Sequence, residues 1–525
     1  VDDAIVVVEN IHRHFAMNDE RPLWKLAVDA VDEVGNPTLL ATWAVIAAIL
    51  PMAFVGGLMG PYMRPIPVGA SVAMVFSAFI AFVVSPWAFV KVLERWRPAP
   101  HSGHGEESAL DRLYRRLMGR LLDNEKARHR FLYAMGGLLL AALALVPLKA
   151  VVIKMLPFDD KEDFEIVLTM PEGSSLEATR AASAEIATVL AARPEVERVV
   201  SYLGLGAPYN FNGLVRHYFL RNEPHMADLV IQLKPKGQRP QSHAVAKAVR
   251  PLVADIVKRR GGRVQVAEVP PGPPVLSTLV FEVYGPDAAV RDGFARKLQE
   301  LLKRTEGISD VDTYLYDPQP LDRLTVDREK ATLNGIAPAQ VAQAARLALA
   351  GETLDIAHAE DELEPVEIRL RLAPERRRGL AGINAVPLIS RAGTAVPLGM
   401  LTRASRVEED APRYRKNGRP VSYVIAEASG RTESPVYALL DLRKSIDALA
   451  KDSGIELETW YANLPDDPGK SALKWDGEWH ITYEVFRDMG AAFALVLLLI
   501  YALVVYWFES FTVPLVIMAP IPLTL

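Results

Sequence analysis

Two adjacent aspartates, Asp2 and Asp3, stand at the start of the sequence and lead directly into an apolar run, residues 4–8. At the end of a helix, such a carboxylate can cap the helix by accepting backbone N–H groups. Inside a membrane it can instead take up and release a proton, because hydrocarbon penalises the charged form. On a helix Asp2 shares a face with Glu9, seven residues later. Which chemistry applies depends on whether the surrounding segments are membrane spans.

Other motifs with a known chemistry are incomplete. The stretch PGKSA, Pro468–Ala472, ends like a phosphate-binding loop, but Leu464 stands where the first glycine is required. There is no cysteine, which excludes thiolate ligands, and the four methionines between residues 151 and 488 are scattered. No Ser-His-Asp pattern stands out, and the net charge is −5 without a long basic block. We therefore expect no enzyme activity, no cofactor, no metal site and no nucleic-acid partner.

Long apolar stretches predict that the chain crosses a membrane several times. A span needs roughly 20 apolar residues, and four complete stretches approach or exceed that length. Shorter apolar segments at residues 1–8 and 510–525 predict partial spans, so we expect a fragment cut within a hydrophobic helix at each end. The complete stretches are Thr38–Met63, Pro65–Val90, Phe131–Leu148 and Met489–Phe508.

Charge in the short connections predicts how these spans are oriented. Residues 91–130 contain ten Lys and Arg residues, whereas the turn at residues 55–66 contains only Arg64. The positive-inside rule therefore places 91–130 in the cytoplasm, where the segment ALDRLYRRLMGRLLD has the pattern of a helix on the membrane surface. Counting crossings from there places the residues between 150 and 489 outside the cytoplasm.

The outer region has the pattern of repeated α/β modules. Two strand–helix–strand units within residues 151–270 predict a βαββαβ module of the ferredoxin-like, split-βαβ type. The pattern resumes at 271–352 and finishes at 419–465, which predicts a second module, and the short strands of 353–418 predict a β-rich insertion. The predicted fold class is a multi-pass α-helical membrane protein with a large α+β region. The other predicted segments are a partial helix at 1–15, a cytoplasmic connection at 16–36, two spans at 37–95, a cytoplasmic amphipathic linker at 96–130, a span at 131–150, a connection at 466–488, and a span followed by a partial one at 489–525.

This topology places Asp2 and Asp3 within the membrane, on a helix that runs from the outside to the cytoplasm. An ionised carboxylate at the middle of a bilayer costs roughly 2.5–3.5 kcal/mol, so such residues usually face a protein interior and carry function. A carboxyl that loads a proton on one side and releases it on the other is what a proton-driven transporter needs. The helix cap stays open as the alternative if a polar loop precedes the helix.

The stretches VDDAIVVVENI, residues 1–11, and PMAFVGGLMG, Pro51–Gly60, resemble the fourth to fifth transmembrane segments of resistance-nodulation-division (RND) efflux pumps. The stretch YWFESFTVPLVIMAPIPL, Tyr506–Leu523, resembles that family's eighth-to-ninth segment junction. The paired aspartates resemble the hydrophobe/amphiphile (multidrug) branch, because the metal-export branch typically lacks the second one. The resemblance covers the whole chain and implies transmembrane segments 4 to 9, periplasmic porter modules and, at 353–418, a docking insertion.

The resemblance also implies an assembly and an activity. It implies a homotrimer in a bacterial inner membrane, coupled to a periplasmic adaptor (membrane fusion) protein and an outer-membrane channel. The implied activity is drug/proton antiport that exports hydrophobic or amphiphilic compounds from the periplasm or the inner membrane. Asp2 and Asp3 match the family's proton-relay aspartates, whose lysine partner lies in a tenth segment outside these residues.

The stretch SYLGLGAPYNFNGLVRHYF, Ser201–Phe219, falls where the family has its switch loop and drug pocket. Its aromatic side chains are rigid apolar surface that could hold amphiphilic ligands, although ordinary core or loop residues are the alternative. Leu205 and Ala207 stand where some drug pumps carry phenylalanines. The predicted pocket residues are Tyr202, Tyr209, Phe211, Tyr218 and Phe219.

Two alternative functions use the same fold. The first is heavy-metal efflux, against which the scattered methionines count. The second is a non-enzymatic subunit for envelope assembly or protein export. The sequence does not name the substrate.

Overall fold

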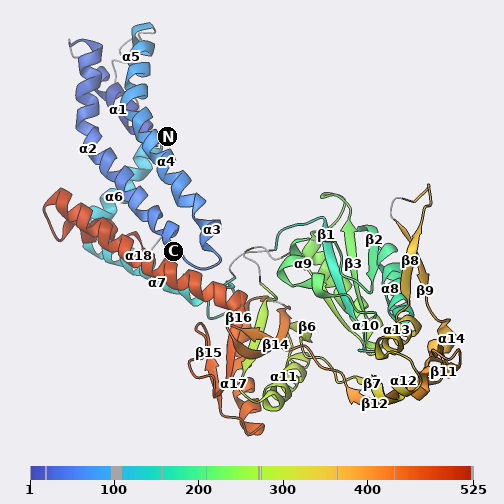
Figure 1. Ribbon diagram of the computed structural model, residues 1–525. Helices are drawn as coiled ribbons and strands as arrows, with labels where there is room; N and C mark the ends of the chain where they lie inside the picture. The colour runs from blue at the N-terminus through green and yellow to red at the C-terminus, as the bar shows by residue number, and fades with distance from the viewer. Residues whose placement is uncertain are drawn as a thin grey trace. The chain divides into compact units, whose positions relative to one another are not determined.

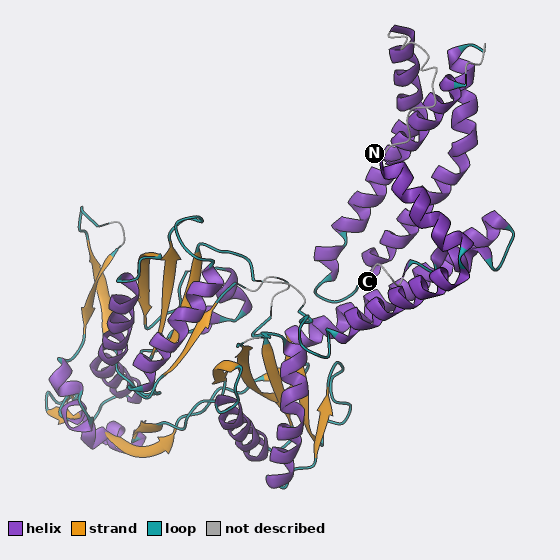
Figure 2. Cartoon of the chain, turned by 180° about the vertical axis from the view of Figure 1, so that it is seen from behind, coloured by secondary structure: helices purple, strands orange, loops and turns teal. Residues whose placement is uncertain are grey.

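The computed structural model describes residues 2–17, 21–95, 109–154, 158–208, 210–269, 272, 275–362, 365–430 and 432–521. The chain forms two compact units. The first comprises Val1–Tyr314 and Arg413–Leu525, and the second comprises Leu315–Pro412. Figure 1 labels the elements of both units, and Figure 2 colours them by secondary structure. The first part of the expected linker, residues 96–108, and the final residues 522–525 lie outside the described ranges.

Three described helical segments are long and apolar enough to cross a membrane: Leu23–Phe54, Gly60–Arg95 and Glu478–Phe508. In the first, α2 (Leu23–Ile49) passes into a 3-10 turn, η1 (Leu50–Phe54), at Pro51, which has no N–H to continue the helix. The second is built from α3 (Gly60–Met63), α4 (Pro65–Phe79), the π-helical turn η2 (Ile80–Val84) and α5 (Ser85–Arg95). The third is the single helix α18 (Glu478–Phe508), and the short helix α19 (Val513–Met518) follows it.

The opening residues form α1 (Asp2–Ala16), which packs against α2 and α5 in both views of the chain (Figures 1 and 2). Their contact is a small apolar core that contains Val7, Ile11 and Ala30. Asn10 adds a buried hydrogen bond from Nδ2 to the carbonyl oxygen of Ala30, at 2.7 Å. A buried amide needs such a partner, so Asn10 fixes the register of α1 against α2.

In two places the helices begin or end at other residues than the expected segments do. The fourth expected span, Phe131–Leu148, is not among the three candidates, because α7 (Glu125–Ala144) begins with charged residues and ends before the apolar stretch does. The expected cytoplasmic connection at 16–36 is largely helical, since α2 begins at Leu23. The amphipathic segment of the expected linker forms α6 (Ala109–Asp123).

The first module is a four-stranded antiparallel sheet in the order β2-β3-β1-β4, with α8 and α10 on one face. The apolar residues of alternate strand positions, such as Ile166 and Leu229, pack against the two helices, because successive side chains point to opposite faces. Its elements are β1 (Asp163–Thr169), α8 (Leu176–Ala191), β2 (Val196–Leu203), α9 (Phe211–Val215), η3 (Tyr218–Leu220), β3 (Met226–Leu233), α10 (Ser242–Lys258) and β4 (Arg263–Ala267).

The second module has the sheet order β13-β14-β5-β16-β15, and β6 also pairs with β14. Strand β5 lies between β14 and β16, and β16 falls in the expected connection at 466–488. Its Lys474 and Asp476 resemble solvent-facing residues in the sequence, but each pairs with a charged partner inside the module, so Lys474 can be buried and Asp476 half-buried. The elements are β5 (Leu279–Tyr284), α11 (Ala288–Lys303), β6 (Ile308–Thr313), β13 (Arg415–Lys416), β14 (Arg419–Ala428), α17 (Pro435–Asp452), β15 (Leu457–Trp460) and β16 (Ser471–Gly477).

The second unit, Leu315–Pro412, begins earlier than the expected insertion at 353–418. Strand β7 belongs to it because it pairs along its whole length with β12, a strand more than 70 residues later. The described part of this unit contains five helices and three two-stranded sheets around its own apolar core. Its elements are β7 (Pro320–Val326), α12 (Arg328–Leu333), α13 (Pro338–Leu349), β8 (Glu352–Ala357), β9 (Val366–Leu370), α14 (Pro374–Arg377), α15 (Leu380–Asn384), β10 (Pro387–Ile389), β11 (Ala395–Pro397), α16 (Leu398–Leu401) and β12 (Thr402–Glu408).

Candidate functional site

The loop at residues 204–221, here called the covering loop, lies over the face of the first module's sheet that α8 and α10 leave free. Glu165 and Val167 of β1 point to this face, because their neighbours Ile166 and Leu168 belong to the helical core. Tyr218 of the loop packs against Val167 in a separate buried cluster. A segment with two short helical turns therefore acts as the second layer of this side of the sheet.

Buried carboxylates attach the covering loop to the sheet. Asp228 of β3 accepts a hydrogen bond from the backbone N–H of Ala207 at 3.0 Å and one from Nε of Arg221 at 2.8 Å. Arg221 also donates from Nη2 to the carbonyl oxygen of Leu168, at 2.6 Å. Because Asp228 is fully buried, these charge-assisted bonds replace the water that the carboxylate has lost. Both ends of the loop are thus held by one side chain.

Glu165 is a second buried carboxyl under the loop, and it is incompletely satisfied. Its Oε2 accepts a hydrogen bond from Nδ2 of Asn210 at 3.3 Å, while Oε1 has no hydrogen-bond partner among the described residues. Burial, followed by the nearby charge of Asp228, raises the pKa of Glu165 to about 7. Glu165 can therefore gain or lose a proton near neutral pH, and it presents a free oxygen beneath the loop.

The aromatic residues predicted for a pocket are placed in different environments. Tyr202 is half-buried on β2, whereas Phe211 and Phe219 are exposed on the covering loop. Tyr218 is buried, and its hydroxyl donates to Oε1 of Gln265 at 3.2 Å. Tyr209 lies outside the described residues. Tyr218 thus belongs to the core, and the exposed apolar surface of the loop is carried by Phe211 and Phe219.

A set of buried charges joins the first module to the second. Arg216 of the covering loop pairs with Glu427 of β14 at 3.0 Å, and Arg250 of α10 pairs with Asp310 of β6 at 3.0 Å. Burial opposes ionisation of Glu427, but the Arg216 charge and the hydroxyl donors around it hold its pKa below the ordinary value. Burial raises the pKa of Asp310 to about 6. The interface is therefore polar, and a change in the charge of these side chains can separate the two modules.

Sequence reasoning missed the residues that α10 contributes to this interface. His243, Lys247 and Arg250 follow one another at intervals of four and three residues, which places them on one face of the helix. Each forms an ion pair with a carboxylate of the second module. The basic stripe was visible in the sequence, but its partners were not, because they lie up to 190 residues away.

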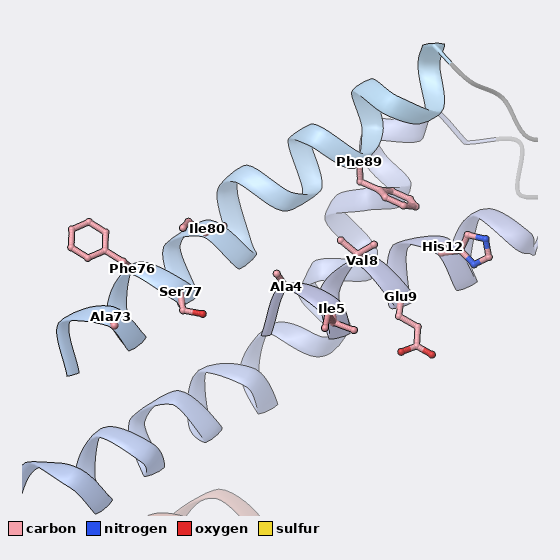
Figure 3. Close-up of a pocket in the computed structure, with 10 residues that line it drawn as sticks. All are labelled: Ala4, Ile5, Val8, Glu9, His12, Ala73, Phe76, Ser77, Ile80 and Phe89. Carbon is pink, nitrogen blue, oxygen red and sulfur yellow. The ribbon is translucent and has the colours of Figure 1, made fainter. Parts of the chain in front are cut away.

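In the helical part of the chain, Asp3 lies on α1 and accepts a hydrogen bond from the hydroxyl of Ser77 on α4, at 3.5 Å. The side chain of Asp2 lies outside the described part of the structure. Next to this contact, α1 and the α4–α5 segment enclose an apolar groove of about 890 Å³. Figure 3 shows its lining, in which Glu9, His12 and Ser77 are the polar members among apolar side chains. Asp3 thus has a partner on a second apolar helix.

No group of three or more His, Asp or Glu residues in the described ranges is arranged to hold a metal ion. The fold and the site together define a protein with three candidate membrane spans and two α/β modules joined through buried ion pairs. The chain belongs to the AcrB/AcrD/AcrF family, a family of RND transporters, whose profile matches residues 1–525.

Two solved structures described as crystal forms of a heavy metal efflux pump are similar in fold. One has a TM-score of 0.71 and 21% sequence identity, and the other has a TM-score of 0.72 and 20% identity. Each comparison covers 99% of this chain and 48% of the solved chain. The chain thus spans about half the length of these structural neighbours.

Proposed function

We propose that this chain forms part of a proton-driven efflux pump, in which Asp2 and Asp3 relay the protons. The observation that carries the proposal is the contact between Asp3 and Ser77, which places a carboxyl between two apolar helices. Such a carboxyl changes its partners when it gains or loses a proton, and this change can shift α1 relative to α4. The membrane potential supplies about 2.3 kcal/mol per charge for each 100 mV.

The proposed substrates are hydrophobic or amphiphilic compounds that bind at the covering loop. The loop exposes five large apolar side chains in 16 residues, which is an unusual density for a water-exposed segment. Aromatic and aliphatic surface of this kind binds apolar ligands, and the Glu165 carboxyl beneath it could select those with a positive charge. The exposed residues are Leu205, Phe211, Leu214, Phe219 and Leu220.

Heavy-metal efflux is the second candidate function. It is favoured by the Glu165 carboxyl under the covering loop, whose Oε1 has no hydrogen-bond partner among the described residues, because carboxylate oxygens are metal ligands. The similar fold of the solved heavy metal efflux pump is compatible with it. The proposed assembly is a homotrimer in a bacterial inner membrane, with a periplasmic adaptor protein and an outer-membrane channel, as family membership suggests.

The proton relay is tested in the full-length protein, expressed in a bacterial strain that lacks its own efflux pumps. We expect Asp3→Asn to abolish tolerance to amphiphilic compounds at an unchanged protein level, because the amide of asparagine cannot take up and release a proton. The control is Asp29→Asn, which removes an exposed carboxylate that pairs with Arg21 on the same group of helices. Normal tolerance in the Asp3 variant would exclude it from the mechanism.

The substrate class is tested by comparing two variants in the same strain. If the exposed aromatic surface binds the substrate, Phe219→Ala reduces tolerance to amphiphilic dyes and leaves metal tolerance unchanged. If the Glu165 carboxyl binds a metal, Glu165→Gln reduces tolerance to divalent metals instead. Loss of metal tolerance alone would decide in favour of the second candidate.

A further inference from the structure

Helix α10 makes three charged contacts to the second module, through His243, Lys247 and Arg250. Its Lys247 donates to a carboxylate oxygen of Glu433, which precedes α17, and its Arg250 pairs with Asp310. Glu433 and Asp310 both adopt positive φ angles, 46° and 50°. Non-glycine residues keep this strained conformation only where their surroundings hold it, and such positions concentrate at functional sites.

His243, at the first turn of α10, lies between carboxylates of both modules. Its Nδ1 is 2.9 Å from Oε2 of Glu268, which follows β4 in the first module. Its Nε2 is 3.0 Å from Oε2 of Glu433 in the second module. Phe158 stacks on the imidazole ring with centroids 4.3 Å apart and fixes the plane of the ring.

This geometry matches only one protonation state. A neutral imidazole has a single N–H and a lone pair on the other nitrogen, so it cannot donate to two carboxylates. In the imidazolium form both nitrogens donate, and both contacts are charge-assisted. Removing one proton turns one of the two contacts into a lone pair facing a carboxylate, which is repulsive.

Other charged groups around His243 modify this contact. Lys247 and Lys154 also approach Glu433, and Lys154 lies over the ring of Phe158 at 4.6 Å. The cavity that His243 lines, of about 20 Å³, is also lined by charged residues of α10 itself, the covering loop, β14 and α18. These residues are Arg216, Arg250, Glu427 and Glu478.

We propose that His243 is a positioning residue for transport: as an imidazolium it bridges the two modules through Glu268 and Glu433, and its deprotonation releases the bridge. This inference rests on the proposed efflux function, because the two modules must separate and close again as substrate passes. His243 itself touches no substrate in this scheme. It couples the separation of the modules to the pH of the compartment that surrounds them.

The direction of the pH dependence follows from the neighbours of His243. Hydrogen bonding to Glu268, against the opposing effect of burial, raises the pKa of His243 above its ordinary value of about 6.5. A group with a raised pKa stabilises the bridged state fully below the ordinary value, and this contribution is lost as the pH rises through the raised pKa. The bridge is therefore closed in acid and open in mild alkali.

The experiment measures the distance between the modules in the full-length protein by double electron–electron resonance. Spin labels are attached at Glu197→Cys on β2 and Lys444→Cys on α17, two exposed positions on different modules. These 525 residues contain no cysteine, so only cysteines elsewhere in the protein need replacement. We expect a population with a longer distance to appear with a midpoint above pH 6.5, and we expect His243→Gln to abolish this titration.

Two further variants make the result decisive. Glu268→Gln keeps the imidazole but removes one charge, so the midpoint should fall by about one pH unit even if His243→Gln folds poorly. His358→Gln, an exposed histidine of the second unit, should leave the midpoint unchanged. A titration that persists at the same midpoint in His243→Gln, or a constant distance in the unaltered protein, would overturn the proposal. Loss of export in Asp3→Asn bears on the proton relay alone, so failure of the bridge and failure of the proposed function are distinguishable.

Discussion

Arg216 of the covering loop donates a hydrogen bond from Nη2 to Oε1 of Glu427 on β14, at 3.0 Å. The two side chains are only 7% and 13% exposed and come from different modules. Glu427 also accepts hydrogen bonds from the hydroxyls of Ser277 and Thr278. This pair therefore ties the loop that presents the proposed substrate surface to the second module.

Replacing Glu427 by Gln should destabilise the protein by about 3 kcal/mol, because it leaves the Arg216 charge buried without its counter-charge. The measurement is thermal unfolding of the full-length protein in detergent. The double variant Arg216→Met with Glu427→Met should recover most of the loss, since apolar residues of similar size need no partner. A double variant as unstable as the single one would show that the charges themselves are not the cause.

Glu165→Gln should change stability in a pH-dependent way. The pKa of Glu165 in the folded state is raised to about 7. As the pH rises from the unfolded pKa toward that value, the unfolded chain loses a proton that the folded state keeps, so the free energy of unfolding falls. The variant should be nearly neutral at pH 5 and more stable than the original by roughly 2 kcal/mol at pH 8. Chemical unfolding at both pH values measures this, with exposed Glu223→Gln as the control. An equal change in the free energy of unfolding at both pH values would contradict the raised pKa of Glu165.

Gly57→Ala should lower stability and the amount of protein in the membrane. Gly57 has φ +63°, and an added Cβ would collide with a carboxylate oxygen of Glu484 on α18. The left-handed backbone alone costs roughly 1–2 kcal/mol for alanine. The double variant Gly57→Ala with Glu484→Ala should relieve the collision with Glu484 but not this backbone cost. The control is Gly69→Ala on α4, which should have little effect because the added Cβ meets open space. The unfolding temperature measures the loss of stability, and the amount of protein in the membrane fraction measures the loss of abundance.

Lys474→Met should destabilise the second module by about 3 kcal/mol. Lys474 is 4% exposed and lies 3.1 Å from Asp476 and 3.5 Å from Glu282, both of which would lose a counter-charge. Lys470→Met is the matched control, because Lys470 pairs with Glu458 at the surface and water replaces that contact. Limited proteolysis and thermal unfolding compare the two variants. Similar effects for both would mean that the buried network contributes little.

Several elements could be predicted from local patterns. The alternation of Phe164 to Leu168 and the cap at Ser175 predict β1 and α8, and both form. Long apolar runs predict α2 and α18, because hydrocarbon requires continuous helix. The run at Phe131–Leu148 shows that length alone does not fix where a helix begins and ends, because α7 extends into the charged residues before the run and ends at Ala144.

The candidate functional site could be predicted from local sequence patterns to a much smaller extent. Periodicity places His243, Lys247 and Arg250 on one helix face and Asp3 on an apolar helix, since side-chain direction follows from helix geometry. Their partners Glu433, Asp310 and Ser77 come from segments 60 to 190 residues away, and only the folded chain brings them close. The same holds for β16 beside β5, because hydrogen bonding between strands carries no signal in the sequence of either strand. Amino-acid order thus indicates many of the helices, strands and candidate membrane spans, because their periodicity is local, while burial and ion pairing between distant segments settle which charges act together.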